Sequence, residues 1–542
     1  MFHKRVIVGF TVVVLLSTFC LPLYAAESTL ADAAMRGDRE AVRSLLKQKV
    51  DVNAPQGDGS TALHWAAYRD DVEMAKLLIA SGASMSAKTR LGEMTPLVMA
   101  ARNGSAPMLA LMLDAKVDPN SRTTNGTTPL MLAAASGKAD SVQLLLDRGA
   151  DVNAKDVTNG QTALMFAAAS GRVDAIRVLL ARGADANAIT KVSQIISMGE
   201  RYKKLTDGKG TRGITSEAGR SDPTSMGGMT SLLFAAREGH MTSIRELVAG
   251  GANVNLVNAA DNMSVLTSAI INGHLDIAMH LLEHGANPKL ATKEGLTPLY
   301  ATIDAQWPER TWYPPPSITE EKTSHLQLLK ALLDRGADPN ARLGKKLWFR
   351  AFHGDWIDPE GATAFWLAAK ANDVPAMKIL VAAGANPNIP SVKGATPLQA
   401  AAGFGLEPQV TNFAPDARLA AVKYLVEECG ANVNGKDSQG YTPLHGAALT
   451  ANHELISYLV AMGADVKARA TNVFGGVGES DKEVQGEVGD TVADMANGPK
   501  AHNMQYPETV KFLETLGSVN SNYCRYSACV VNTLATPKKK EP

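Results

Sequence analysis

The sequence predicts an all-α solenoid of about eleven to twelve helix-turn-helix repeats, joined by β-hairpin-like connections and interrupted by long inserts. A Thr-Ala-Leu or Thr-Pro-Leu opening followed by Ala-Ala recurs at Thr61, Thr95, Thr128 and Thr162, which are 34, 33 and 34 residues apart. Between the openings falls a leucine-rich block that ends in Gly-Ala-Asp or Gly-Ala-Asn, as in "LLLDRGADVNAK". A fixed period of this length indicates stacked repeats and not a set of independent domains.

The first 26 residues are set apart from this pattern. Lys4 and Arg5 precede a stretch without charge over residues 6–26, which is typical of a secretory signal peptide cleaved near Ala25 or Ala26. The alternative is an uncleaved anchor, because 21 residues could just span a bilayer. We therefore expect a periplasmic or secreted protein that has no membrane contact after signal cleavage.

Each repeat has a physical interpretation as a pair of helices. Threonine caps an inner helix and proline suits its first turn. The Ala-Ala pair lets that helix approach its neighbours, and a glycine such as Gly137 or Gly171 ends it. The outer helix is expected to bury a Leu-Leu pair, such as Leu145 and Leu146, and to end at the glycine of Gly-Ala-Asp. One such unit cannot bury its own leucine face, so the units must stack.

The series continues along most of the chain. Later openings stand at Thr230, Ser264, Thr297, Thr363, Thr396, Thr442 and Thr491. With "GSTALHWAA", "NGTTPLMLAAASG" and "LLDRGADVNA" as its best examples, the pattern resembles the ankyrin repeat family. The resemblance implies an array over residues 27–468 and a degenerate capping repeat over 490–518. Trp366 occupies the position that holds His64 and His445 in other repeats, which favours a packing role for it.

Long inserts depart from the family pattern, and long insertions commonly carry function. Four of them interrupt the array, a fifth is a flexible stretch rich in glycine and acidic residues, and a tail with two cysteines and a basic end follows the cap. The corresponding ranges are 189–226, 307–325, 343–360, 404–418, 469–489 and 519–542.

Two surfaces are candidates for binding a protein partner. Aromatic residues gather in the inserts, which is the composition of interface hot spots, although tryptophans packed back onto the stack would give the same pattern. The family resemblance also implies a concave groove lined by exposed positions of the inner helices. The candidate partner-binding residues are Trp307, Trp312, Tyr313, Trp348, Phe349, Phe352 and Trp356 in the inserts, with Tyr68, Arg69, Arg102, Arg237 and Glu238 in the groove.

Composition narrows the remaining functional classes. The chain has 542 residues with 54 Lys plus Arg against 54 Asp plus Glu, so it lacks the broad basic charge of a nucleic-acid-binding protein. Its 45% hydrophobic content excludes a disordered chain. In an oxidising compartment Cys524 and Cys529 form a candidate disulfide, with two free thiols as the alternative.

No catalytic chemistry is expected. The "HLLEH" segment from His280 to His284 matches a pattern of some zinc proteases. The repeat register explains it without a metal, because Leu281 and Leu282 are the leucine pair of an outer helix. We expect a monomeric, non-catalytic scaffold without cofactor or metal that binds a protein partner. An accessory subunit of an exported enzyme and a secreted effector remain as alternatives.

Overall fold

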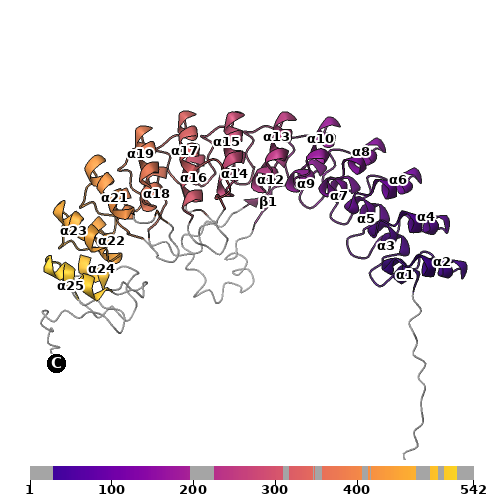
Figure 1. The fold of residues 1–542 in the computed structure, drawn as a ribbon, viewed down its shortest axis with the longest axis horizontal. Helices are drawn as coiled ribbons and strands as arrows, with labels where there is room; N and C mark the ends of the chain where they lie inside the picture. Colours follow the sequence, from indigo (N-terminus) through magenta and orange to yellow (C-terminus); the bar gives the residue numbers. More distant parts are fainter. Residues whose placement is uncertain are drawn as a thin grey trace, which may run out of the picture. The chain divides into compact units, whose positions relative to one another are not determined.

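The structure is a computed structural model that describes residues 29–195, 225–308, 317–345, 347, 357–405, 413–414, 417–471, 489–497 and 506–521. The chain divides into two compact units, Met1–Asp118 and Pro119–Pro542. Both units consist of successive pairs of antiparallel helices, coloured along the sequence in Figure 1.

The first unit contains three helix pairs. In each pair a helix of the inner row is followed by a helix of the outer row. The elements are α1 (Leu30–Arg36), α2 (Arg39–Lys47), α3 (Ala62–Tyr68), α4 (Val72–Ala80), α5 (Pro96–Asn103) and α6 (Ala106–Asp114).

The second unit continues the same alternation and adds one two-stranded ribbon and a π-helical turn, η2. Figure 1 shows its outer helices, such as α13, α15 and α17, side by side in one row and the inner helices in another. The elements are α7 (Pro129–Ser136), α8 (Ala139–Asp147), α9 (Ala163–Ala169), α10 (Val173–Ala181), β1 (Ser193–Gln194), β2 (Ser225–Met226), α12 (Ser231–Arg237), α13 (Met241–Ala249), α14 (Val265–Ile271), α15 (Leu275–Glu283), α16 (Pro298–Gln306), α17 (His325–Asp334), α18 (Ala364–Lys370), α19 (Val374–Ala382), α20 (Pro397–Ala401), α21 (Arg418–Lys423), η2 (Tyr424–Glu428), α22 (Pro443–Leu449), α23 (His453–Ala461), α24 (Val492–Ala496) and α25 (Pro507–Thr515).

The inner helices begin and end where the sequence pattern predicts. Thr128 has an extended backbone before α7, and its hydroxyl accepts a hydrogen bond from the backbone N–H of Met131. Gly137 ends the helix with a φ of 83°. The positive φ favours glycine, and a Cβ here would also displace the side chain of Arg172, whose Cδ would lie 2.6 Å away.

The leucine pairs of the outer helices are only partly as predicted. Leu145 and Leu179 are fully buried, whereas Leu146 and Leu180 are half-buried. The second leucine points along the outer row, since the side chain of Leu180 lies next to Gly250 of the following outer helix. In α8 and α10 the first leucine therefore lies in the core and the second is half-buried at the surface of the outer row, whereas both Leu281 and Leu282 of α15 are buried.

An asparagine ladder, which the sequence analysis did not predict, connects successive repeats. The side chain of Asn153 donates to the carbonyl oxygen of Gly183 and accepts from the backbone N–H of Asp185. Asn187, Asn255 and Asn340 repeat both contacts with the Gly-Ala-Asp/Asn turn of the next repeat. The asparagine of each "N-A" block therefore fixes the distance between repeats, because it satisfies one donor and one acceptor of its neighbour.

Three of the inserts are closed at their base by backbone pairing. Strands β1 and β2 pair antiparallel, with Ser193 opposite Met226 and Gln194 opposite Ser225. Isolated antiparallel bridges join Arg342 to Thr363 and Arg469 to Thr491. This pairing returns the chain to the repeat register after each insert.

The observed architecture confirms the predicted all-α repeat solenoid. Apart from the β1–β2 ribbon and the two bridges, the described residues form helices, turns and connecting loops. Among these residues, no helix combines the length and the apolar character needed to cross a membrane. The number of repeats and the segment boundaries stay predictions.

Candidate protein-binding site

A histidine at the third residue of an inner helix fixes the entrance to two of the repeats. Nδ1 of His64 accepts from the backbone N–H of Thr61 at 3.1 Å, and its Nε2 lies 2.9 Å from the carbonyl oxygen of Met94 in the next repeat. These contacts define the neutral tautomer with the proton on Nε2. Burial lowers the pKa of His64, which stabilises this neutral form. The ring is therefore a structural bridge between repeats.

Trp366 forms the same kind of bridge between repeats as His64, with an indole ring in place of the imidazole. It is fully buried, and its indole N–H donates to the carbonyl oxygen of Ala395 at 2.9 Å. Met94 and Ala395 both stand one residue before the threonine that opens the next repeat. The structure thus gives Trp366 the packing role that its register predicts.

Residues of α3, α5 and the connection between α4 and α5 form an open cleft of about 370 Å³. We call it the tryptophan cleft and define it by Trp65, Tyr68, Leu91, Met99 and Arg102. The rings of Trp65 and Tyr68 meet edge to face with their centroids 5.8 Å apart. Leu91 is 82% exposed and Tyr68 is 51% exposed, so the cleft presents apolar surface to solvent.

Two charged residues line the tryptophan cleft, and only Asp58 has hydrogen-bond partners within the described part of the chain. The carboxylate of Asp58 accepts from the backbone N–H and from the hydroxyl of Ser60, both at 2.8 Å. These hydrogen bonds lower the pKa of Asp58. Arg102 is exposed and has no hydrogen-bonded or ionic partner within the described part of the chain. Its guanidinium is therefore available to a carboxylate of a partner.

The predicted groove residues separate into three groups. Tyr68 and Arg102 meet in the tryptophan cleft. Arg69 instead donates to the carbonyl oxygen of Met35 at 3.2 Å and so caps the preceding inner helix. Arg237 and Glu238 of the second unit bond to each other at 2.8 Å, and the guanidinium of Arg237 lies 5.2 Å from the ring centroid of Phe234.

The predicted aromatic insert residues are represented in the described structure by Trp307 alone. Its ring is half-buried, and its indole N–H donates to a carboxylate oxygen of Asp373 at 2.8 Å. The other predicted residues of this class, and the candidate disulfide, lie outside the described residues: Trp312, Tyr313, Trp348, Phe349, Phe352, Trp356, Cys524 and Cys529.

The His280–His284 segment lies on α15 as the repeat register predicts. Leu281 and Leu282 are both buried, and Nδ1 of His284 lies 2.8 Å from the carbonyl oxygen of His280. Within the described ranges, no three or more His, Cys, Asp or Glu side chains are grouped in a way that could hold a metal ion.

Of the five residues that define the tryptophan cleft, the sequence predicted Tyr68 and Arg102 as binding residues but not Trp65, Met99 or Leu91, and the most exposed of the three is Leu91. It lies in the connection "AKTRLGEMTP", where the aligned position of a later repeat, "AKDVTNGQTA", holds Thr158. An apolar residue at a position that is polar in another repeat was the available signal. This signal lies in a short connection between α4 and α5, outside the helices and the long inserts.

Comparison with known families agrees with this architecture. The chain matches the family described as "Ankyrin repeats (3 copies)" over residues 30–123, 97–190, 221–309 and 410–470, and the single "Ankyrin repeat" over 360–392. The chain belongs to the ankyrin repeat family. Ankyrin repeats are protein–protein interaction scaffolds and are typically non-catalytic, so this chain is an interaction scaffold with a protein as the expected kind of partner.

Curated relatives share only this repeat region with the chain. ZDHHC13 of Danio rerio is 26% identical over 243 residues, which is 44% of this chain and 30% of that protein. Alpha-latrocrustotoxin-Lt1a of Latrodectus tredecimguttatus is 27% identical over 220 residues, 39% of this chain and 13% of the toxin. Potassium channel KOR1 of rice is 42% identical over 102 residues, 19% of this chain and 12% of the channel. The chain thus spans less than a third of each relative.

Proposed function

We propose that this scaffold binds a protein segment at the tryptophan cleft. The segment inserts an apolar side chain between Tyr68, Leu91 and Met99 and places a carboxylate on Arg102. The observation that carries this proposal is the exposure of Leu91 and Tyr68 beside an arginine without a partner in the described structure. Aromatic residues and arginine are the usual energetic anchors of protein interfaces.

The apolar and the charged part of the tryptophan cleft would contribute to binding in different ways. The indole N–H of Trp65 donates to the side chain of Gln56 at 2.7 Å, which fixes the orientation of the ring without a partner. A preformed aromatic wall reduces the entropy lost on binding. Arg102 adds specificity for orientation, since a guanidinium donates hydrogen bonds to a carboxylate in a defined geometry.

Site-specific photo-crosslinking in the native cell tests the proposal. A photoreactive residue at position 91 should capture a distinct protein, and adding Tyr68→Ala with Arg102→Gln should remove the adduct while the helical circular dichroism stays unchanged. Val157 provides the matched control, because it is also apolar and 64% exposed but does not line the tryptophan cleft. Equal capture at positions 91 and 157, or an adduct that survives both substitutions, would refute this site.

We also propose that the chain is exported and that residues 1–26 are removed. The charge and hydropathy pattern of this segment supports the proposal. Fractionation of the native cell and N-terminal sequencing of the mature protein test it. A mature chain that begins near Glu27 in the periplasm would favour a periplasmic scaffold or an accessory enzyme subunit, whereas release to the medium would favour a secreted effector. A full-length chain in the cytoplasm would contradict export.

A further inference from the structure

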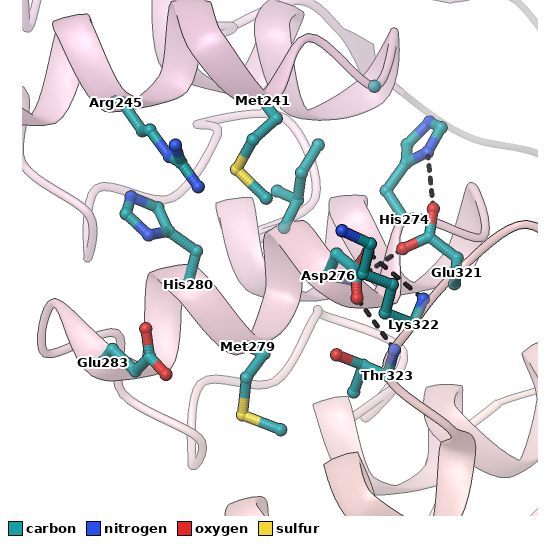
Figure 2. A pocket seen from close by; sticks show the side chains of 12 residues that line it. Met241, Arg245, His274, Asp276, Met279, His280, Glu283, Glu321, Lys322 and Thr323 are labelled. Atoms are coloured by element: carbon teal, nitrogen blue, oxygen red, sulfur yellow. Dashed lines mark hydrogen bonds and ion pairs between the residues drawn. The ribbon is translucent and has the colours of Figure 1, made fainter.

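A second cleft, of about 420 Å³, lies on the outer row between α13 and α15. We call it the outer cleft. Figure 2 shows Arg245 and His280 directed toward each other at one end of it, with Met241 between this end and a group of bonded side chains at the other. Its volume falls in the range of sites that hold a small ligand or a single anchoring side chain.

The far end of the outer cleft is closed by a segment of the insert that precedes α17. The carboxylate of Asp276 accepts from the backbone N–H groups of Lys322 and Thr323, at 3.2 and 2.8 Å. In return, the carboxylate of Glu321 accepts from the backbone N–H of Asp276 at 2.6 Å and lies 4.0 Å from His274. The carboxylates of Asp276 and Glu321 are thus already bonded, and a third carboxylate, that of Glu283, lines the cleft near His280 (Figure 2). The end with Arg245 and His280 is left to determine what the outer cleft can bind.

Arg245 differs from basic residues at the same helix position in other repeats. It is the fifth residue of α13, and the fifth residues of α2, α4 and α10 are Arg43, Lys76 and Arg177. Each of these three pairs with an acidic side chain three residues earlier. Arg245 has Thr242 at that place and no ionic or hydrogen-bonded partner within the described part of the chain.

The preceding pair of outer helices shows which group is missing. There Arg177 of α10 donates to the carboxylate of Glu246, the sixth residue of α13, at 2.6 Å. At the equivalent contact one repeat later, Arg245 of α13 faces the sixth residue of α15, which is His280. Nε2 of His280 is buried and has no hydrogen-bond partner among the described residues. A carboxylate thus stands between the helices in one repeat. In the next repeat the described residues place none there, which leaves the exposed Arg245 without an ionic partner and Nε2 of His280 without a hydrogen bond.

We propose that the outer cleft binds a carboxylate carried by a small apolar body, between the guanidinium of Arg245 and Nε2 of His280. Met241, Ile277 and Met279 line the cleft and would contact the apolar body. The carboxylate would form charge-assisted hydrogen bonds with both groups and so restore the contact that Glu246 makes one repeat earlier. The same chemistry is offered by a free organic acid and by the C-terminal carboxylate of a peptide. This site is independent of the tryptophan cleft.

The surroundings of His280 give the binding a defined pH dependence. Burial lowers the pKa of His280, the nearby His284 and Arg245 lower it further, and Glu283 opposes them. A bound carboxylate favours the protonated ring, so binding takes up a proton. Because the free ring is still neutral at the ordinary histidine pKa of about 6.5, affinity is expected to keep rising as the pH falls through this value.

Methionine-methyl NMR on the full chain tests the proposal with three probes. They are 4-methylpentanoate, 4-methylpentanamide, and an acetylated tripeptide that ends in leucine with a free carboxylate. We expect saturable shifts of the Met241 and Met279 methyl signals with at least one carboxylate probe at about 1 mM, and none with the amide. Arg245→Gln should weaken binding at least about tenfold, whereas the matched Arg177→Gln should leave it unchanged.

A second variant should abolish binding without unfolding the protein, so that loss of binding cannot be explained by loss of the fold. His280→Glu places a carboxylate where Glu246 stands in the preceding contact, so it should pair with Arg245, abolish binding and raise the melting temperature. Binding of 4-methylpentanoate supports the site with a free acid as its ligand, and binding of the tripeptide alone supports it with a peptide terminus. Absence of binding by both carboxylates, equal binding of the amide, or binding unaffected by Arg245→Gln would overturn the proposal.

Discussion

Two side-chain pairs at the same register show how the inserts change the repeat. In the first unit, Arg39 begins α2 and bonds at 2.7 Å to Asp71, the N-cap of α4. In the second unit, His325 begins α17 and lies 2.8 Å from Asp373, the N-cap of α19. The side chains of Arg39 and Asp71 are 51% and 11% exposed, whereas those of His325 and Asp373 are 14% and 4% exposed.

The insert between α16 and α17 accounts for the difference. Its residue Trp307 adds a second donor to Asp373, whose side chain is only 4% exposed. Burial alone would raise the pKa of Asp373, but the hydrogen bonds from His325, Trp307 and the backbone N–H of Ala376 lower it overall. The contact between Arg39 and Asp71 is thus partly open to solvent, whereas Asp373 is almost fully buried under its donors His325 and Trp307. We call Asp373, His325 and Trp307 the enclosed centre.

The largest expected effect comes from removing the enclosed carboxylate. Asp373→Ala removes the buried acceptor of the half-buried His325 and Trp307 donors and also removes the N-cap of α19. It should lower the free energy of unfolding by ~3 to 5 kcal/mol, as breaking a buried pair does. Asp71→Ala, which removes an exposed pair and one cap, should cost only ~1 to 2 kcal/mol.

Urea unfolding followed by circular dichroism measures both variants. Repeat proteins lose stability mainly near the substituted repeat, so hydrogen exchange of the neighbouring helices localises each effect. Equal costs for Asp71→Ala and Asp373→Ala would show that the insert does not enclose the pair as the structure indicates.

The next largest effect is the pH dependence of stability that arises from the histidine at the third position of α22. His445 is fully buried, with Nδ1 accepting from the backbone N–H of Thr442 and Nε2 lying 3.3 Å from the carbonyl oxygen of Asp490. Burial lowers its pKa to about 4. The neutral ring is favoured in the folded state, so its stabilisation is complete above the unfolded pKa near 6.5 and is lost as the pH falls toward 4.

Lowering the pH from 7 to 5 should therefore cost roughly 2 kcal/mol at His445. His445→Gln should remove this dependence, because Gln399 in another repeat accepts from the backbone N–H of Thr396 and donates to the carbonyl oxygen of Tyr441, the same two roles. The check is the slope of unfolding free energy against pH for both proteins. An unchanged slope in the glutamine variant would place the titrating group elsewhere.

The sequence predicted the parts of the fold that depend on neighbouring residues. Thr128 as a cap, Gly137 as a stop and the burial of Trp366 follow from local preferences and from a constant period. The asparagine ladder was missed although it follows the same period, because turn propensity already explained residues such as Asn153. Its contact with Gly183 crosses between repeats.

The candidate sites were less predictable because they depend on contacts between different repeats. The bond from Trp307 to Asp373 spans 66 residues and crosses an insert, so the period no longer shows which residues face each other. The missing partner of Arg245 becomes visible only when its contacts are compared with those of Arg177. Tyr68 and Arg102 were predicted as groove residues, but the neighbouring Leu91 was not.

A smaller effect is expected from removing one donor of the enclosed centre. Trp307→Phe keeps an aromatic ring and deletes the N–H that bonds to Asp373 at 2.8 Å. The bond has a charged acceptor and is partly exposed, so its loss should cost about 1 kcal/mol. Denaturant unfolding measures the cost, and Trp65→Phe, which deletes the bond to Gln56 in the first unit, is the matched control. A cost as large as that of Asp373→Ala would mean that the part of the indole ring that phenylalanine does not replace contributes beyond the hydrogen bond.

The smallest effect is expected at the exposed pair of the first unit. Arg39→Gln removes the ion pair with Asp71 but leaves its N-cap bond to the backbone N–H of Met74. Because solvent screens exposed charges, the loss should be below about 1 kcal/mol and should shrink as salt rises toward about 1 M. His325→Gln, compared under the same conditions, should keep its full cost at high salt, since screening does not reach an enclosed hydrogen bond. Matching salt dependence in the two variants would mean that water reaches both pairs equally, which would remove the distinction between the two regions.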